Sequence, residues 1–354
     1  LEPKVIVADE PTSALDSVAA DRVLNLLFDL TQRAQTSLIL ITHDMEVARR
    51  AHRIVVMANG EIVEAGPTHT LLSAARSPEA RALLRARALY QPGASAGDGK
   101  PAKPAPFLRV NELRAGRGGK TIVSGAAFSV ARGERLAIVG RSGSGKTSLM
   151  RAVLGLLPSR ADITLDGHAV TPGANILRRS LAMVFQDPAT SFNPRHRIWQ
   201  IVTEPLYREG LSRTIRRAKA EALLAQVDMA GVLDERPHRF SGGQRQRIAI
   251  ARALIGAPEV LIADEAVSAL DAQLRAEVIG LLDRLVRDHQ IALIFITHDL
   301  RLVRHLADRM LVMDAGKVVE EGPPEMLFAS AKHPATKALL AAVDSGAHKP
   351  ETAV

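Results

Sequence analysis

The amino-acid sequence predicts an α/β protein with a parallel core sheet, and three observations support this fold class. Apolar runs of strand length alternate with amphipathic segments of helix length, as in parallel sheets that are covered by helices. A glycine-rich loop follows one of the apolar runs and precedes a helix-compatible stretch. Much of the first quarter of the chain recurs in its last third, which indicates tandem copies of one domain.

The elements can be placed from these patterns. Strands are expected at 135–139, 260–263 and 291–296, and helices at 272–287 and 324–330. The Asp166-Gly167 pair follows a short apolar run and predicts a hairpin turn. Residues 195–255 are expected to be mainly helical and are rich in arginine.

The glycine-rich loop has the pattern of a phosphate-binding loop. Its sequence is Gly140-Arg141-Ser142-Gly143-Ser144-Gly145-Lys146-Thr147, followed by Ser148 at the start of the helical stretch. Glycines let backbone N–H groups face an anion, and the helix N-terminus adds a positive dipole. Lys146 can reach the β- and γ-phosphates, and the Thr147 hydroxyl can ligate Mg²⁺. We therefore expect a nucleotide site here.

The repeat has a nearly constant spacing. Val5 to Asp16 recur as Val260 to Asp271, and Ile41 to Asp44 recur as Ile296 to Asp299, both at 264 − 9 = 255 residues. Met57 to Gly60 recur as Met313 to Gly316 at 316 − 60 = 256 residues. We expect a truncated first domain at 1–90, a flexible linker at 91–106, a complete second domain at 107–345 and a tail at 346–354. The first domain lacks an equivalent of 107–259.

The amino-acid composition excludes several kinds of partner and site. The chain has 354 residues and a formal net charge of +8, but its arginines are scattered and only 3% of residues are aromatic, so we expect no nucleic-acid partner. Cysteine is absent, which excludes disulfides, iron–sulfur clusters and thiolate zinc sites. No apolar run reaches the roughly 18 residues of a membrane span, and no signal peptide is visible. We expect a soluble, cytoplasmic chain.

Two further patterns accompany the loop. Asp264 and Glu265 end an apolar strand, where a carboxylate could hold Mg²⁺ and its neighbour could act as a general base. Alone, this pair is as compatible with an ordinary acidic turn, and the phosphate loop favours the metal site. Ser241 is a good N-cap before Gly242 and Gly243, which predicts either a second anion site or a capped surface helix.

Ser241-Gly242-Gly243-Gln244, placed after the phosphate loop and before the aspartate–glutamate strand, resembles the signature of ABC-type ATPases. The resemblance implies a parallel core sheet, an antiparallel β subdomain and a helical subdomain. It implies catalytic roles for Lys146, Glu265 and His298, and metal ligands at Thr147, Gln186 and Asp264. The implied nucleotide-binding residues are Gly140, Arg141, Ser142, Gly143, Ser144, Gly145, Lys146, Thr147, Ser148, Gln186, Ser241, Gly242, Gly243, Gln244 and Asp271.

A narrower resemblance points to importers. The segment from Phe185 to Arg195 and the late segment from His333 to Leu340 are similar to oligopeptide and dipeptide importer ATPases. Two positions differ: Arg117 stands where the family has an adenine-stacking aromatic, and Ala335 stands where it has a tyrosine. The resemblance implies an ATP- and Mg²⁺-dependent ATPase that energises import of peptides or related solutes.

The implied partners are two membrane permease subunits, a substrate-binding protein and a second ABC domain, at the cytoplasmic face of the inner membrane. Two alternatives remain: a soluble ABC ATPase that acts on ribosomes or DNA, and a non-catalytic fragment. Asp9, Glu10, Asp16 and His43 of the first copy have no phosphate loop or signature beside them. We therefore expect uncovered apolar edges at 5–8 and 38–41, and a twin ATPase that lacks on the order of 150–200 residues.

Overall fold

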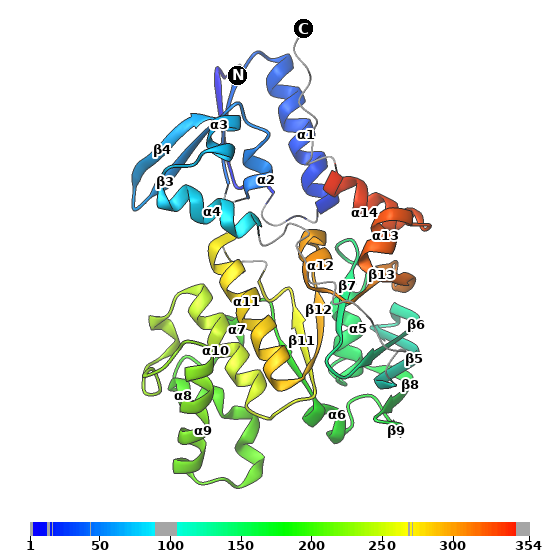
Figure 1. Ribbon diagram of the computed structural model, residues 1–354. Coiled ribbons are helices and arrows are strands. Elements are labelled where there is room, and N and C mark those ends of the chain that lie inside the picture. Colours follow the sequence, from blue (N-terminus) through cyan, green and yellow to red (C-terminus); the bar gives the residue numbers. More distant parts are fainter. Residues whose placement is uncertain are drawn as a thin grey trace.

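The computed structural model describes residues 3–344 except 13, 14, 16, 43, 89–104, 268, 269 and 271. Asp16, His43 and Asp271, the predicted tail and nearly all of the predicted linker therefore lie outside the described residues. We refer to residues 3–88 as the N-terminal part and to residues 105–344 as the C-terminal part (Figure 1). Strand β5 begins at Pro106, one residue inside the predicted linker.

The C-terminal part contains a six-stranded sheet in the order β10-β11-β12-β7-β13-β14. Its strands are β7 (Arg135–Val139), β10 (Leu181–Val184), β11 (Val260–Asp264), β12 (Ala292–Ile296), β13 (Arg309–Asp314) and β14 (Lys317–Gly322). The first five in spatial order are parallel. β14 is antiparallel to β13 because Ala315 and Gly316 form a tight turn at φ 44° and 78°. The expected parallel sheet is therefore a mixed sheet with one antiparallel edge strand.

Alternate residues of the sheet enter two separate cores. Leu136 and Ile138 pack with helix α5 (Lys146–Val153) and with the second sheet. Ala137 and Val139 pack on the other face, with helices α10 (Gly242–Leu254) and α11 (Ala272–His289). Both faces are buried, which explains why these strands read as continuous apolar runs.

A second sheet is antiparallel, in the order β6-β5-β8-β9. Its strands are β5 (Pro106–Arg117), β6 (Lys120–Ala131), β8 (Ser159–Leu165) and β9 (His168–Val170). Asp166 and Gly167 have φ of 50° and 80° between β8 and β9, so the hairpin prediction is confirmed.

Helices fill most of the chain between β10 and β11, as predicted. They are α7 (Pro188–Ser191), α8 (Ile198–Val202), η1 (Glu204–Glu209), α9 (Arg213–Gln226), η2 (Pro237–Arg239) and α10. The remaining helices of this part are α6 (Asn175–Ser180), α12 (Leu300–Leu306), α13 (Pro324–Ser330) and α14 (Pro334–Asp344). None of the helices described combines the length and the apolar character that a membrane crossing requires.

The N-terminal part has two small sheets and four helices in its described residues. Its elements are β1 (Val5–Asp9), α1 (Ser17–Arg33), β2 (Ser37–Ile41), α2 (Met45–Ala48), β3 (Arg53–Ala58), β4 (Glu61–Pro67), α3 (Thr68–Ser73) and α4 (Pro78–Ala88). β1 and β2 are parallel, and β3 and β4 are antiparallel. Val5, Val7, Ile39 and Ile41 are exposed, as expected for uncovered apolar edges.

Local geometry repeats at the sequence spacing of 255 or 256 residues. Glu10 and Glu265 both have positive φ, at 42° and 47°. The Glu10 N–H donates to Ile41 O at 2.9 Å, and the Glu265 N–H donates to Ile296 O at 3.0 Å. The irregularity after Val56 in β3 has its counterpart after Val312 in β13.

Candidate functional site

The glycine-rich loop connects β7 to α5 and turns through backbone conformations that require glycine. Gly143 and Gly145 have φ of 77° and 101°. A Cβ at Gly140 would lie 2.3 Å from the carbonyl oxygen of Met313. The loop is therefore pressed against the end of β13, and its shape brings backbone N–H groups together at the N-terminus of α5.

Lys146 lies inside this loop. Lys146 is only 7% exposed. Its Nζ donates to the carbonyl oxygens of Gly140 at 2.7 Å and Arg141 at 3.0 Å. The ammonium is thus held where loop and helix meet. An anion bound by the loop would meet both the backbone N–H groups and this charge.

Thr147 and Asp264 face each other beside the loop. Thr147 Oγ1 donates to Asp264 Oδ1 at 2.8 Å, which joins the first turn of α5 to the end of β11. Burial raises the pKa of Asp264, and the Thr147 hydrogen bond opposes that effect. A hydroxyl and a buried carboxylate are oxygen ligands of the kind that Mg²⁺ prefers, so the two residues fit the predicted metal.

Nucleotide phosphates and water would supply the remaining ligands of such a metal. Mg²⁺ is usually held by one or two carboxylates together with phosphates and water. Among the described residues, no group of three or more His, Cys, Asp or Glu side chains is suited to hold a metal by itself.

Glu265 and His298 form the next pair along the same sheet edge. His298 Nδ1 lies 3.7 Å from Glu265 Oε1. The neighbouring His298 lowers the pKa of Glu265, and burial acts in the opposite direction. The carboxylate is therefore ionised at neutral pH, as a group that accepts a proton from water must be.

Gln186 lies at the same sheet edge. It follows β10, which pairs in parallel with β11 so that Val184 is opposite Ala263. Because parallel strands end at one edge, Gln186 lies beyond the end of β10 near the level of Asp264, and its side chain is exposed.

Ser241 to Gln244 lie elsewhere. Ser241 is the N-cap of α10, and the Gln244 side chain accepts from the Ser241 N–H at 3.0 Å. α10 packs on the sheet face opposite to α5. The structure therefore brings Lys146, Thr147, Asp264, Glu265, His298 and Gln186 to one edge, whereas Ser241 caps a helix on the sheet face opposite to α5.

Comparison with known proteins identifies the family of this chain. Residues 123–268 match the ABC transporter family. A solved structure of cbiO1 from Clostridium perfringens, part of the ABC transporter complex cbiONQ, is 30% identical with a TM-score of 0.58, covering 64% of this chain and 91% of that chain. This chain belongs to the ABC transporter family. Its ABC domain is the one that holds the phosphate loop.

Two curated relatives are longer than this chain. The glutathione import ATP-binding protein GsiA of Escherichia coli (strain K12) is 40% identical over 385 residues, covering 96% of this chain and 61% of GsiA. The peptidoglycan transport ATP-binding protein YejF of Agrobacterium fabrum is 38% identical over 354 residues, covering 96% of this chain and 65% of YejF. The chain thus spans less than two thirds of each relative.

Arg252 is a residue of this ABC domain that sequence reasoning missed. From α10, its guanidinium donates to Ser191 O at 3.0 Å and to Ser191 Oγ at 2.8 Å, and it stacks over Phe192 at 5.1 Å to the ring centroid. Arg252 therefore links α10 to α7, the helix that follows Gln186. No spacing pattern distinguishes Arg252 from the many other arginines of this region.

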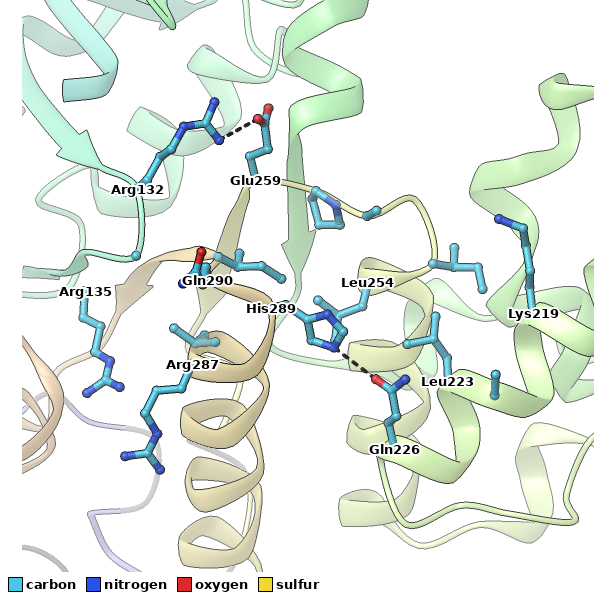
Figure 2. A pocket seen from close by; sticks show the side chains of 17 residues that line it. Arg132, Arg135, Lys219, Leu223, Gln226, Leu254, Glu259, Arg287, His289 and Gln290 are labelled. Atoms are coloured by element: carbon cyan, nitrogen blue, oxygen red, sulfur yellow. Dashed lines mark hydrogen bonds and ion pairs between the residues drawn. The ribbon is translucent and has the colours of Figure 1, made fainter. Parts of the chain in front are cut away.

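A cavity of about 850 Å³ lies away from the predicted site. Figure 2 shows Arg132 beside Glu259, at 2.7 Å, and His289 beside Gln226, at 3.0 Å. These residues lie at the amino ends of β7 and β11 and at the carboxyl ends of α9 and α11. None of the predicted site residues lines this cavity.

Proposed function

We propose that the chain is an ATP-binding and ATP-hydrolysing subunit that energises import of peptides or related small solutes through a separate membrane permease. The hydrogen bond between Thr147 and Asp264 carries the proposal, because it places a hydroxyl and a carboxylate beside the phosphate loop. The similarity to proteins named for glutathione import and peptidoglycan transport supports the importer assignment.

Each residue of the candidate site has a separate role in the proposed ATP hydrolysis. The loop N–H groups and Lys146 bind and orient the phosphates, which is the main requirement of phosphoryl transfer. Glu265 accepts a proton from the attacking water, and His298, 3.7 Å from that carboxylate, orients it and lowers its pKa. Thr147, Asp264 and Gln186 would hold Mg²⁺, which when bound neutralises charge on the phosphates.

We also propose that the N-terminal part is the later portion of a first ABC domain. Its apolar side chains are exposed where their counterparts are buried: Val5 is 50% exposed and Val260 0%, and Val7 is 62% exposed and Ile262 0%. In the C-terminal part those counterparts are covered by α5, β5 and β6. We propose that an equivalent half-domain covers the face formed by Val5, Val7, Ile39 and Ile41.

The position of the Ser241 segment implies that ATP hydrolysis needs a second ABC domain. Ser241 lies across the sheet from the loop of its own domain, so a second ABC domain must bring a signature segment to ATP on Lys146. We expect the 354-residue chain to bind ATP, and to hydrolyse it slowly unless two chains pair their C-terminal parts head to tail.

Coupling to two permease subunits is proposed to run through the segment after Gln186. Asp187 is exposed and α7 is anchored to α10 by Arg252. Movement imposed on α7 would therefore reach α10, the helix that Ser241 caps. Such a subunit acts at the cytoplasmic face of the inner membrane, with a substrate-binding protein as a further component.

The test compares the purified chain at increasing concentration. We expect ATP binding at every concentration and hydrolysis per chain that rises with concentration. Concentration-independent hydrolysis by the monomer would contradict the requirement for a second domain. Co-purification with permease subunits supports the importer assignment, and co-sedimentation with ribosomes would support the soluble alternative instead.

A further inference from the structure

We infer that the two parts of the chain bind each other through two symmetry-related helix contacts that do not depend on nucleotide. α4 of the N-terminal part packs on α11 of the C-terminal part, and α14 of the C-terminal part packs on α1 of the N-terminal part (Figure 1). α1 and α11 are related by 255 residues, and α4 and α14 by 334 − 78 = 256 residues. Each contact is therefore the counterpart of the other, as in an isologous interface.

An ion pair joins equivalent turns of the two parts. Arg301 Nη2 lies 3.5 Å from Asp44 Oδ2, with 34% and 36% of the two side chains exposed. Asp44 is the counterpart of Asp299, at 299 − 44 = 255 residues. The N–H of each aspartate donates at 3.0 Å to the threonine hydroxyl two residues earlier, Thr42 and Thr297. The ion pair thus links two turns of the same construction.

The turn in the C-terminal part reaches the sheet edge that holds the candidate site. Arg301 also contacts Asp299, with Nε at 3.3 Å and the backbone N–H at 3.0 Å from Oδ1. His298 precedes Asp299 directly and lies 3.7 Å from Glu265. The contact between the parts therefore ends one residue from the histidine of the proposed hydrolytic pair.

These contacts use surfaces other than the phosphate loop and the Ser241 segment. The helices involved are α1, α4, α11 and α14, and the ion pair involves Asp44 and Arg301. An ATP sandwich would need Lys146 to face a signature segment, which is a different surface. The helix contacts can therefore keep the two parts aligned while a nucleotide-dependent interface opens and closes.

Cross-linking tests the position of the ion pair. The sequence contains no cysteine, so a chain carrying Asp44→Cys and Arg301→Cys has two thiols only. A short bis-maleimide should join them within one chain, to the same extent with and without ATP. The control pair is Asp44→Cys with Lys219→Cys, because Lys219 is exposed on α9, at the far end of the C-terminal part (Figure 1).

Two results would overturn the inference. Equal yields from both cysteine pairs would show that the two parts have no fixed arrangement. Cross-links that form only between chains would show that the parts pair in trans. The inference uses the proposed duplication to match equivalent helices, but the cross-linking readout is independent of ATP hydrolysis, so the two can fail separately.

A charge-reversal cycle tests the energetics. A protease site inserted within 91–104 would separate the two parts, which should then co-elute at micromolar concentration. Asp44→Arg should weaken their association by about two- to fivefold, the range of an exposed ion pair, and the double variant Asp44→Arg/Arg301→Asp should restore it. Glu112→Arg, which breaks an exposed ion pair with Arg114 at 3.4 Å, is the matched control. Free separation of the unsubstituted parts, or no recovery in the double variant, would contradict the inference.

Discussion

Thr147 Oγ1 donates a hydrogen bond of 2.8 Å to Asp264 Oδ1, although 117 residues separate the two in the sequence. The bond joins the helix that follows the phosphate loop to strand β11. Asp264 is only 4% exposed, and burying a carboxylate is costly unless it has a partner. The same oxygen atoms are the ones that the proposed Mg²⁺ site requires.

Lys146→Ala should weaken ATP binding by about 10- to 100-fold, because charge-assisted hydrogen bonds contribute roughly 1.5–3 kcal/mol each. Fluorescence of a labelled ATP analogue would measure the dissociation constant. Lys317→Ala is the control, since Lys317 is exposed on β14. An unchanged affinity in Lys146→Ala would remove this lysine from the nucleotide site.

Glu265→Gln should slow hydrolysis by about 10²- to 10⁴-fold, the usual contribution of a general base, and leave ATP affinity within about twofold. Steady-state phosphate release at high protein concentration would measure it. Glu10→Gln is matched in backbone geometry, at φ 42° against 47°, and should retain the parental rate. If Glu265→Gln also hydrolyses at that rate, another group activates the water.

His298→Ala should move the acid limb of the hydrolysis profile to higher pH. The neighbouring His298 is the largest cause that lowers the pKa of Glu265. Removing the imidazole therefore raises that pKa, and activity is lost at a higher pH as the carboxylate gains its proton. His289→Ala is the control, because His289 bonds to Gln226 instead. A profile with the same acid limb in both variants would refute the proposed coupling.

Gly140→Ala should destabilise the fold more than Gly143→Ala. An alanine Cβ at Gly140 would lie 2.3 Å from Met313 O, whereas nothing lies within 4 Å of a Cβ at Gly143. We expect a loss of about 1–2 kcal/mol for Gly143→Ala, from its left-handed backbone alone, and about 3 kcal/mol for Gly140→Ala. Urea unfolding would measure both, and equal losses would show that the loop can move away from β13.

Ile262→Ser and Val7→Ser should differ although the positions are equivalent. Ile262 is 0% exposed, and the serine variant should lose about 3–5 kcal/mol. Val7 is 62% exposed, and its serine variant should change the free energy of unfolding by at most about 0.5 kcal/mol. In a chain that carries the proposed covering half-domain, Val7→Ser should become costly. Equal effects there and in the 354-residue chain would argue against such a cover.

Patterns within a short stretch of sequence predicted most of the fold and which residues meet at the sheet edge beside the phosphate loop. The strands β7, β11 and β12 and the helix α13 lie where apolar runs and periodicity placed them. Lys146, Thr147, Asp264 and Glu265 could be identified because each stands at a fixed offset from a strand end or a glycine. The antiparallel direction of β14 was not predicted, since a tight turn after β13 reverses the chain at Ala315 and Gly316.

Contacts that depend on tertiary packing could not be predicted. Arg252 binds Ser191 across 61 residues, and Arg301 approaches Asp44 across 257 residues. Arginine is frequent throughout the chain, so no local pattern marks these two. Their partners are defined only when α10 packs on α7 and when the two parts of the chain meet.

The paired helices α4–α11 and α14–α1 have an evolutionary consequence. In a homodimer one substitution changes both halves of an isologous contact, because both partners carry it. Here the partners are two stretches of one polypeptide, so each mutation alters one half only. Arg301 shows the result: its counterpart, at 301 − 255 = 46, is Glu46. The two helix contacts can therefore come to differ in charge. An interface built from two equivalent helix pairs then loses its symmetry.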